Sequence, residues 1–418
     1  METNFQSSAA CVAIIILVAS YLHKINIPRL VGKGTIGIDC KLHDAPFRTS
    51  VCMTWKNVLK NNVTTLEQLE KYVDLSPEEQ KRLKRVIERH PMSITRYYLS
   101  LIDWSNPNDP LKKMVVPSVE ELNLSGSYDT SGERKNTKMP GLQHKYLQTA
   151  LILATNKCAT YCRYCFRKRL VGLPTEEVIH RFSMAVNYIK KHTEINNVLI
   201  SGGDPFMLST TVIEKFLEKL SVIPHLDFIR FGTRVPVTFP ERILGDKDLP
   251  KLLERYAFRN KKIYIVTQFN HPREITDMSK DAVDMLTRSG IIVNNQSVLL
   301  KGVNDDPDIL AELQNKLVGI GVNPYYVFQC RPVKRVKQQF AIPLYKGYWV
   351  VEEAKKKLNG HSKRFRYVMS HITGKIEIIG IMNDEIYLKY NQAENDKNIG
   401  KFFKKKLNKT AVWLDDLH

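Results

Sequence analysis

The segment "CATYCRYCFRKR", residues 158–169, holds three cysteines, Cys158, Cys162 and Cys165, followed directly by basic residues. A structural zinc site takes four ligands, and no fourth Cys or His of the sequence lies at a fitting spacing. Three thiolates instead suit a [4Fe–4S] cluster in which cysteines hold three irons and the fourth iron stays open. The spacing therefore predicts an iron–sulfur cluster whose open iron can be chelated by a substrate or a cofactor.

The overall charge is strongly basic. The 418 residues include 63 Lys and Arg against 43 Asp and Glu, a net charge of +20. Such charge can indicate nucleic acid or an anionic membrane as a partner. The sequence carries no nucleic-acid-binding motif, and part of the excess lies in 355–363 and 401–409. We therefore expect a basic surface and a basic tail, with neither nucleic acid nor a membrane as the partner.

Two features bear on the compartment. Seven cysteines, three of them within eight residues, are too sparse and clustered for a secreted disulfide scaffold, so we expect the reducing cytoplasm. The apolar run 9–22 is shorter than the roughly 20 residues of a membrane span, and no Lys or Arg precedes it. This run favours a buried or partner-packed helix, or an extension without a catalytic role, over a weak membrane or targeting element.

The pattern of secondary structure changes along the chain. Residues 53–101 have a helical pattern, with cap-like helix starts at Thr64-Thr65-Leu66-Glu67 and Ser76-Pro77-Glu78-Glu79, and 123–141 is predicted to be a long loop. Six short apolar runs then alternate with helical patterns, at 148–155, 197–201, 227–233, 262–269, 291–300 and 324–330. The alternation predicts an α/β fold with a parallel sheet, a partial (β/α)6 barrel. The predicted regions are an apolar extension, a helical region with its loop, the barrel, and a C-terminal segment, at 1–52, 53–144, 145–345 and 346–418.

Each apolar run leads into polar or special residues. In folds of this kind the chemistry collects at the carboxyl ends of the strands. In strand order these residues are Cys158; Gly202, Gly203 and Asp204; Thr233 and Arg234; Asn270 and His271; Asn295 and Gln296; and Cys330 and Arg331. We expect these six groups to meet at one site.

The flanking motifs are more specific. They are "HKYLQTALILATNKCATYCRYCFRKR", "ISGGDPF", "FGTRVPV", "FNHPREIT", "NNQSVLLKGVND" and "PYYVFQC". Together they resemble the lysine 2,3-aminomutase family of the radical S-adenosylmethionine superfamily, over roughly residues 53–380. The resemblance implies a radical SAM barrel with a C-terminal pyridoxal phosphate (PLP) extension. It also implies an isomerase that moves an α-amino group to the β-carbon, with a [4Fe–4S] cluster, S-adenosylmethionine and PLP as cofactors.

The resemblance implies roles for the residues at the strand ends. Cys158, Cys162 and Cys165 are expected to hold the cluster, and the open iron to bind the methionyl part of S-adenosylmethionine. The backbone at Gly202 and Gly203, with Asp204, is expected to approach that part. The residues expected to line the adenosyl part are Arg234, Gln268, His271 and Gln296.

Other residues are implied for PLP and the substrate. Lys375, after Gly374 in "YVMSHITGKIEIIG", is expected to bind PLP covalently, although the family has several glycines there. Lys145 and Tyr146 match an Arg-Tyr pair that serves the cofactor's phosphate and ring, and a second phosphate arginine matches Thr149. Arg167 matches the arginine that holds the substrate's α-carboxylate as a bidentate partner.

The substrate is not fixed by the resemblance. The lysine enzyme binds the distal ammonium with two aspartates, and the matching positions here hold Arg331 and the Met369, Ser370 and His371 region. Because an arginine repels a lysine ammonium, the pattern is closer to the glutamate 2,3-aminomutase branch, with a glutamate or another acidic or polar substrate. Alternatives are lysine as substrate, an enzyme that rearranges lysine for elongation factor P, and a non-catalytic iron–sulfur nucleic-acid-binding protein.

Two expectations concern protein partners. We expect the chain to form a homo-oligomer, and we expect a flavodoxin or a ferredoxin to be its electron donor.

Overall fold

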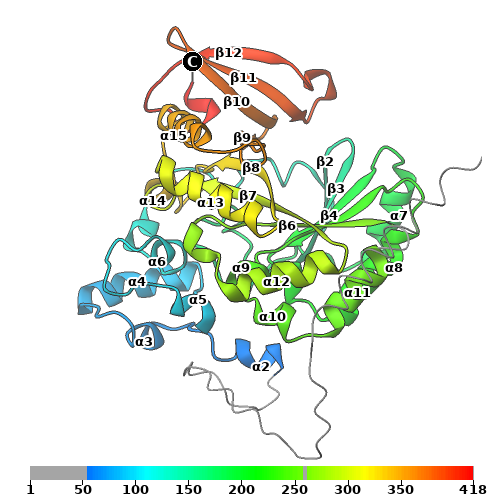
Figure 1. Cartoon of the computed structure of the whole chain (residues 1–418), viewed down its shortest axis with the longest axis horizontal. Helices are drawn as coiled ribbons and strands as arrows, with labels where there is room; N and C mark the ends of the chain where they lie inside the picture. Colours follow the sequence, from blue (N-terminus) through cyan, green and yellow to red (C-terminus); the bar gives the residue numbers. More distant parts are fainter. Residues whose placement is uncertain (1–53, 258–260, 418) are drawn as a thin grey trace, which may run out of the picture. The chain divides into compact units, whose positions relative to one another are not determined.

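One twelve-stranded sheet, with β1 to β12 in sequence order, runs through the computed structural model, which describes residues 54–257 and 261–417 (Figure 1). Its centre is a block of parallel strands that match the six predicted runs. They are β3 (Thr149–Thr155), β4 (Asn197–Gly202), β5 (Phe228–Gly232), β6 (Lys262–Thr267), β7 (Ile292–Leu299) and β8 (Asn323–Gln329). The predicted α/β fold with a central parallel sheet is confirmed.

Helices connect the parallel strands. The longer ones are α7 (Phe182–Lys191), α8 (Thr210–Ser221), α11 (Asp248–Ala257), α12 (Asp277–Arg288) and α13 (Pro307–Gly319), and short helices α9 (Val235–Thr238) and α10 (Glu241–Leu244) follow β5. Side-chain caps start several of them, as Ser209 does for α8 and Asp306 for α13. Figure 1 shows α8, α11, α12 and α13 along one side of the strands.

The burial pattern of the strands shows which side faces a cavity. Residues of β5 and β7 alternate between buried and half-buried positions. Successive side chains of a strand point to opposite faces, so one face lies under the helices and the other stays partly open. Arg230, Gly232 and Gln296 are on the half-buried face.

The N-terminal region is helical, as predicted. It comprises α2 (Trp55–Leu59), α3 (Leu66–Leu69), α4 (Pro77–Arg89), α5 (Arg96–Ser100), α6 (Pro110–Val115) and the 3-10 turn η1 (Val119–Leu122). Thr65 and Ser76 each form a capping box, which confirms those two helix starts. The loop that follows leads into β1 (Thr137–Met139) and β2 (Leu142–Tyr146), which pair antiparallel with each other and with β3. The apolar run 9–22 lies outside the described residues.

The C-terminal region continues the same sheet. After α14 (Lys337–Phe340) and α15 (Leu344–Lys356), β9 (Arg366–His371) pairs parallel with β8. The antiparallel strands β10 (Gly374–Met382), β11 (Glu385–Ala393) and β12 (Phe402–Lys406) follow. The basic tail is therefore an edge strand, in which Lys404 pairs with Glu385 at 2.8 Å. The proposed boundaries at 144/145 and 345/346 fall inside β2 and α15.

Contacts across the unfilled part of the barrel link β2 to β9. The Lys145 Nζ donates to the carbonyl oxygens of His371 at 2.7 Å and Ser131 at 2.8 Å. The loop residue Ser127 also forms an isolated bridge with Val333, after β8. Side-chain contacts and one bridge, in place of a strand ladder, thus close this gap.

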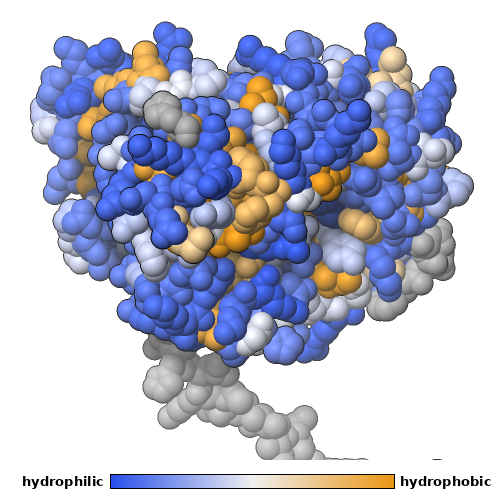
Figure 2. Space-filling view, turned by 90° about the horizontal axis from the view of Figure 1, so that it is seen from above, coloured by the Kyte–Doolittle hydropathy of each residue, from blue (hydrophilic) through white to orange (hydrophobic). Residues whose placement is uncertain are grey.

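The surface is mostly hydrophilic on the face shown in Figure 2, with smaller hydrophobic areas between. Exposed apolar side chains on the C-terminal strands include Ile379, Met382 and Phe402. Within the described ranges, no helix has both the length and the apolar character needed to cross a membrane.

Candidate active site

Residues from β2 to β10 line one cavity of about 380 Å³. It brings together residues that are more than 200 positions apart in the sequence, such as Cys158 and Lys375. Among the strand-end residues expected to meet here, Asn270, His271 and Asn295 do not line it. The other residues to which a role was assigned all line it: Lys145, Tyr146, Cys158, Cys162, Cys165, Arg167, Gly202, Gly203, Asp204, Arg234, Gln268, Gln296, Arg331, Ser370 and Lys375. His271 instead caps the 3-10 turn η3 (Pro272–Glu274), where its Nδ1 accepts from the Arg273 N–H at 3.2 Å.

The three cysteines have the chemistry of a cluster site. Cys158, Cys162 and Cys165 are free thiols that line the cavity. Burial raises the pKa of the Cys158 thiol well above its usual range and that of Cys165 to about 11. Thiolates at such positions need a bound cation, and an iron–sulfur cluster supplies it. The residues present therefore fit a three-cysteine cluster.

The end of β4 packs tightly against the loop that carries the cysteines. A Cβ on Gly203 would lie 2.4 Å from the Lys157 carbonyl oxygen, and one on Gly202 would lie 2.3 Å from the Thr155 carbonyl oxygen. Gly202 also has a φ of +118°, which a residue with a side chain rarely adopts. Both glycines are thus required for the approach of two backbones, beside the residue that begins the cysteine set.

Asp204 organises the neighbouring strand end. Its buried carboxylate accepts from Thr233 Oγ1 at 2.6 Å, from the Arg234 N–H at 2.7 Å and from the Phe206 N–H at 3.0 Å. Burial raises the pKa of Asp204, and these donors oppose the rise. The carboxylate therefore fixes the turn that presents Arg234 to the cavity.

Arg234 connects that turn to the cysteines. Its Nη1 donates to Cys162 Sγ at 2.9 Å, its Nε donates to the Gln268 carbonyl at 3.0 Å, and its Nη2 pairs with buried Glu274. Tyr98 of α5 donates to the same Glu274 carboxylate at 2.6 Å. The Gln268 Nε2 is buried on the cavity wall without a hydrogen-bond partner in the described structure, so it can donate to a bound ligand.

Arg167 is held by a carboxylate that sequence reasoning missed. Glu133, from the loop before β1, accepts from Arg167 Nε at 3.0 Å and pairs with Arg169 at 2.8 Å. The Arg167 Nη1 donates to Ser201 Oγ at 3.1 Å and to the Gly202 carbonyl at 3.3 Å. This arrangement orients the guanidinium beside the end of β4, where it could bind a carboxylate.

Arg331 and several residues around it also line the cavity. The Arg331 Nη1 donates to Ser131 Oγ at 2.8 Å, and burial lowers the pKa of its guanidinium. Tyr146 is close to Ser370: burial raises the pKa of Tyr146 to about 12, and a hydrogen bond with Ser370 opposes this rise. Burial, assisted by the charge of Arg331, lowers the pKa of Lys145 to about 8.

Lys375 has the properties of a lysine that forms an imine. It lies on β10 with its Nζ 4.5 Å from the centroid of the Tyr326 ring. Burial, assisted by the charges of Arg230, Arg331 and Lys145, lowers the pKa of its ammonium to about 7. An amine that is substantially neutral near pH 7 is nucleophilic toward the PLP carbonyl, so Lys375 fits this cofactor.

Arg230 is the second residue that the sequence analysis missed, after Glu133. It lies in the middle of β5 and lines the cavity. A charged residue inside the apolar run "FIRFG" is a detectable signal, since an unpaired charge inside a strand needs a reason. Glu133 gave no such signal because it lies in an irregular loop.

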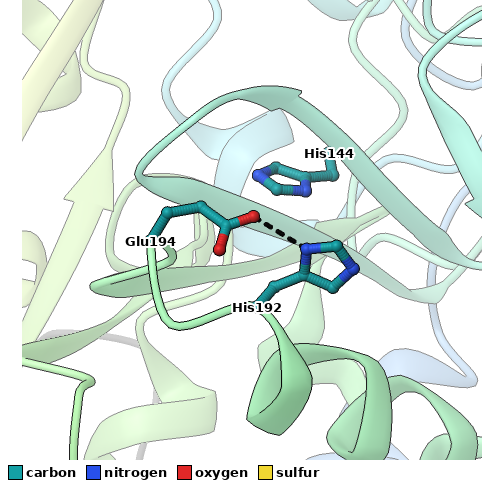
Figure 3. A group of neighbouring side chains, drawn as sticks. All are labelled: His144, His192 and Glu194. Carbon is teal, nitrogen blue, oxygen red and sulfur yellow. Dashed lines mark hydrogen bonds and ion pairs between the residues drawn. The ribbon is translucent and has the colours of Figure 1, made fainter.

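A separate group of possible metal ligands comes from β2 and from the end of α7 with the turn that follows it. His144, His192 and Glu194 have ligand atoms within 4.8 Å of one another (Figure 3). His192 Nδ1 bonds to Glu194 at 2.7 Å, and the His144 nitrogens bond to the Tyr188 hydroxyl at 3.1 Å and to the Leu147 carbonyl at 3.0 Å. None of the three lines the cavity. Protein hydrogen bonds already engage these groups.

Comparisons with known proteins agree with this geometry. The Radical SAM superfamily matches residues 152–313. The chain is 44% identical over 351 residues to an Aquifex aeolicus protein assigned as an L-lysine 2,3-aminomutase, which covers 83% of this chain and 93% of that one. It is 40% identical to L-lysine 2,3-aminomutase of Acetoanaerobium sticklandii, with 74% and 73% covered. It is 36% identical to glutamate 2,3-aminomutase of Clostridioides difficile, with 68% and 67% covered.

Radical SAM enzymes carry a [4Fe–4S] cluster and S-adenosylmethionine and require a reductant, and the lysine 2,3-aminomutases also use PLP. These are the groups that the cysteines and Lys375 fit. The chain is thus an isomerase with an amino acid substrate, and it belongs to the lysine 2,3-aminomutase family of radical S-adenosylmethionine enzymes.

Proposed function

We propose that this aminomutase acts on an amino acid with an acidic or polar side chain, glutamate first, and moves its α-amino group to the β-carbon. One observation carries the proposal: Arg331 lines the cavity without an ion pair to any carboxylate of the described residues. A half-buried guanidinium in that state favours an anionic ligand over a cationic one.

The two guanidinium groups that could bind such a substrate share one aromatic ring. The guanidinium carbon of Arg167 lies 4.6 Å from the centroid of Phe166, and that of Arg331 lies 4.0 Å from it. A short diacid could therefore place its α-carboxylate at Arg167 and its side-chain carboxylate at Arg331. Arg167 follows the last cluster cysteine by two residues, so this arrangement also positions the substrate near the radical source.

In the proposed enzyme the cofactors supply the radical and the electron sink, and the protein supplies placement. Arg167 and Arg331 hold the substrate's two ends. Lys375 offers a neutral amine for cofactor attachment, and the apolar faces of Tyr326 and Phe328 beside its Nζ limit access of water.

A second candidate substrate is lysine, because several relatives are named for it, including the Acetoanaerobium sticklandii enzyme. Arg331 weighs against this candidate, since a lysine ammonium placed there would be repelled. The alternative of a non-catalytic nucleic-acid-binding protein loses its ground, because the homologues are aminomutases.

The deciding experiment is anaerobic turnover of the reconstituted enzyme with a panel of amino acids, with the β-amino products identified by mass spectrometry. We expect a β-amino diacid from glutamate and little β-lysine from lysine. Formation of β-lysine without β-glutamate would refute the proposed role of Arg331.

We further propose that the electron donor is a flavodoxin- or ferredoxin-like protein. The acidic surface of such a donor would be attracted to this enzyme, whose net charge is +20. The rate at which the donor reduces the enzyme should therefore fall as the salt concentration is raised.

A further inference from the structure

Arg230 is a half-buried cation that lacks a charged partner among the described residues. Its Nη2 donates to the Asn197 amide oxygen, and its Nε is buried with no hydrogen-bond partner in the described ranges. No carboxylate in the described part of the chain forms an ion pair with it, and burial lowers the pKa of its guanidinium. The guanidinium carbon lies 5.8 Å from the centroid of the Phe228 ring, which is a neutral partner. A buried guanidinium in this state is costly unless an anion completes it.

The location of Arg230 distinguishes it from the other two arginines of the cavity. Arg167 and Arg331 flank Phe166, next to the cluster cysteines. Arg230 instead donates to Asn197, which is the first residue of β4. The same Asn197 amide oxygen also accepts from the Oγ1 of Thr149, the first residue of β3. The cavity thus has cations at two separate places, one near the cysteines and one toward the amino ends of the strands.

Arg230 is also the charged neighbour with the largest effect on Lys375. After burial, its charge is the strongest cause that lowers the pKa of that amine. A PLP molecule attached at Lys375 carries its phosphate a few bonds from the point of attachment. A guanidinium binds a phosphate dianion with two parallel N–H donors, and the free Nε of Arg230 is one such donor.

We propose that Arg230 binds the phosphate group of PLP, with Thr149 and Asn197 fixing the guanidinium. Here Arg230 is a cofactor-binding residue at the amino ends of the strands. The substrate's carboxylates are assigned to Arg167 and Arg331, which lie beside Phe166 near the cysteines. The assignment of Arg230 to the cofactor's phosphate therefore rests on the proposed function.

The test compares PLP with pyridoxal, which lacks the phosphate. Each is titrated into the cluster-containing enzyme, and the visible absorption of the lysine-bound form gives the affinity. We expect Arg230→Met to weaken PLP binding about 10- to 100-fold, the usual range for a charge-assisted hydrogen bond, and to leave pyridoxal binding unchanged. Arg230→Lys should restore part of the PLP affinity. Equal weakening of both compounds, or of neither, would overturn the proposal.

The matched control is Arg364→Met. Arg364 is exposed and also donates to an asparagine amide, that of Asn323 at 2.8 Å, so it tests loss of an Arg–Asn contact alone. The Arg364→Met variant should bind both compounds like the wild type.

The melting temperature gives a second test. Without PLP, Arg230→Met should have a higher melting temperature than the wild type, because an unpaired charge has been removed from the interior. With PLP bound, the wild type should have the higher melting temperature. Failure of the wild type to bind PLP at all would reject PLP as a cofactor, whereas PLP binding without turnover of any diacid would reject the proposed substrate alone.

Discussion

The guanidinium carbon of Arg331 lies 4.0 Å from the centroid of the Phe166 ring, and Phe166 stands between Cys165 and Arg167 in the sequence. The residue that we propose for substrate selection therefore packs on the segment that binds the cluster. Phe166 thus contacts both arginines that we propose for the substrate's carboxylates, and it directly follows the predicted cluster ligand Cys165. In that proposal, one aromatic side chain links substrate selection to the segment that binds the cluster.

Replacing Arg331 should change substrate preference. Loss of one charge-assisted contact costs about 1.5 to 3 kcal/mol, so Arg331→Met should lower kcat/KM for glutamate by roughly 10- to 100-fold. Arg331→Asp should lower it further and raise the turnover of lysine, because the new carboxylate can pair with an ammonium. The measurement is kcat/KM for both substrates under anaerobic conditions. An unchanged glutamate-to-lysine ratio in both variants would contradict the role of Arg331.

Attachment of PLP should depend on pH through Lys375. Because the pKa of this amine is lowered from 10.5 to about 7, the reactive neutral form is present above about pH 7 and is lost as pH falls below it. The rate of PLP uptake by the apoenzyme should therefore rise through a midpoint near pH 7. A midpoint near 10.5, as for an exposed lysine, would show that the amine is not perturbed. Lys375→Ala should abolish the absorption of the lysine-bound cofactor at any pH.

The cysteine segment should depend on Glu121 for stability. This buried carboxylate bonds to Arg163 at 2.6 Å and to Lys168 at 2.5 Å. Glu121→Gln leaves both cations buried without their charge partner, which should lower the free energy of unfolding by about 3 to 5 kcal/mol. Urea unfolding at neutral pH is the measurement. Glu312→Gln, which breaks an exposed pair with Lys316, is the control and should change it by less than about 1 kcal/mol.

The stabilisation that Glu121 provides through Arg163 and Lys168 should also depend on pH. Burial raises the pKa of Glu121, but Arg163 and Lys168 outweigh it and hold the pKa at about 2, below its usual 4.5. The stabilisation by Glu121 is therefore fully present above pH 4.5 and is lost as pH falls toward about 2. The stability difference between the wild type and Glu121→Gln should shrink over that window. A difference that stays constant on acidification would contradict the assignment.

Gly203 should tolerate no side chain. A Cβ there would lie 2.4 Å from the Lys157 carbonyl oxygen, so Gly203→Ala must displace the loop that begins at Cys158. We expect reduced iron content after reconstitution and a loss of most activity. Gly319→Ala is the matched control, because a Cβ at that position of α13 meets nothing within 4 Å. This variant should retain its iron, with a stability equal to the wild type or higher by about 0.5 to 1 kcal/mol.

The sequence allowed the parallel strands and most of the cavity to be predicted because both follow local rules. Short apolar runs between helical patterns locate β3 to β8, and residues at the carboxyl ends of parallel strands must meet. His271 shows the limit of that rule: it follows β6 as expected, but the turn η3 uses its ring as a cap.

Residues outside that rule were found only in the structure. Glu133 reaches Arg167 from a loop whose path no periodicity describes. The region boundaries at 144/145 and 345/346 also depended on the change of pattern, whereas they fall inside β2 and α15, and the same sheet continues beyond each of them. Local pattern therefore predicts elements better than it predicts how far a sheet continues.

The contact between Lys145 and His371 has a consequence for how the barrel is closed. Separating any two neighbouring parallel strands would break a ladder of backbone hydrogen bonds, whereas separating β2 from β9 breaks side-chain contacts such as this one. The gap between β2 and β9 is thus held by fewer backbone hydrogen bonds than any pair of neighbouring parallel strands. Lys145 also lines the cavity, so one ammonium belongs both to the cavity wall and to the contact that joins the two ends of the barrel.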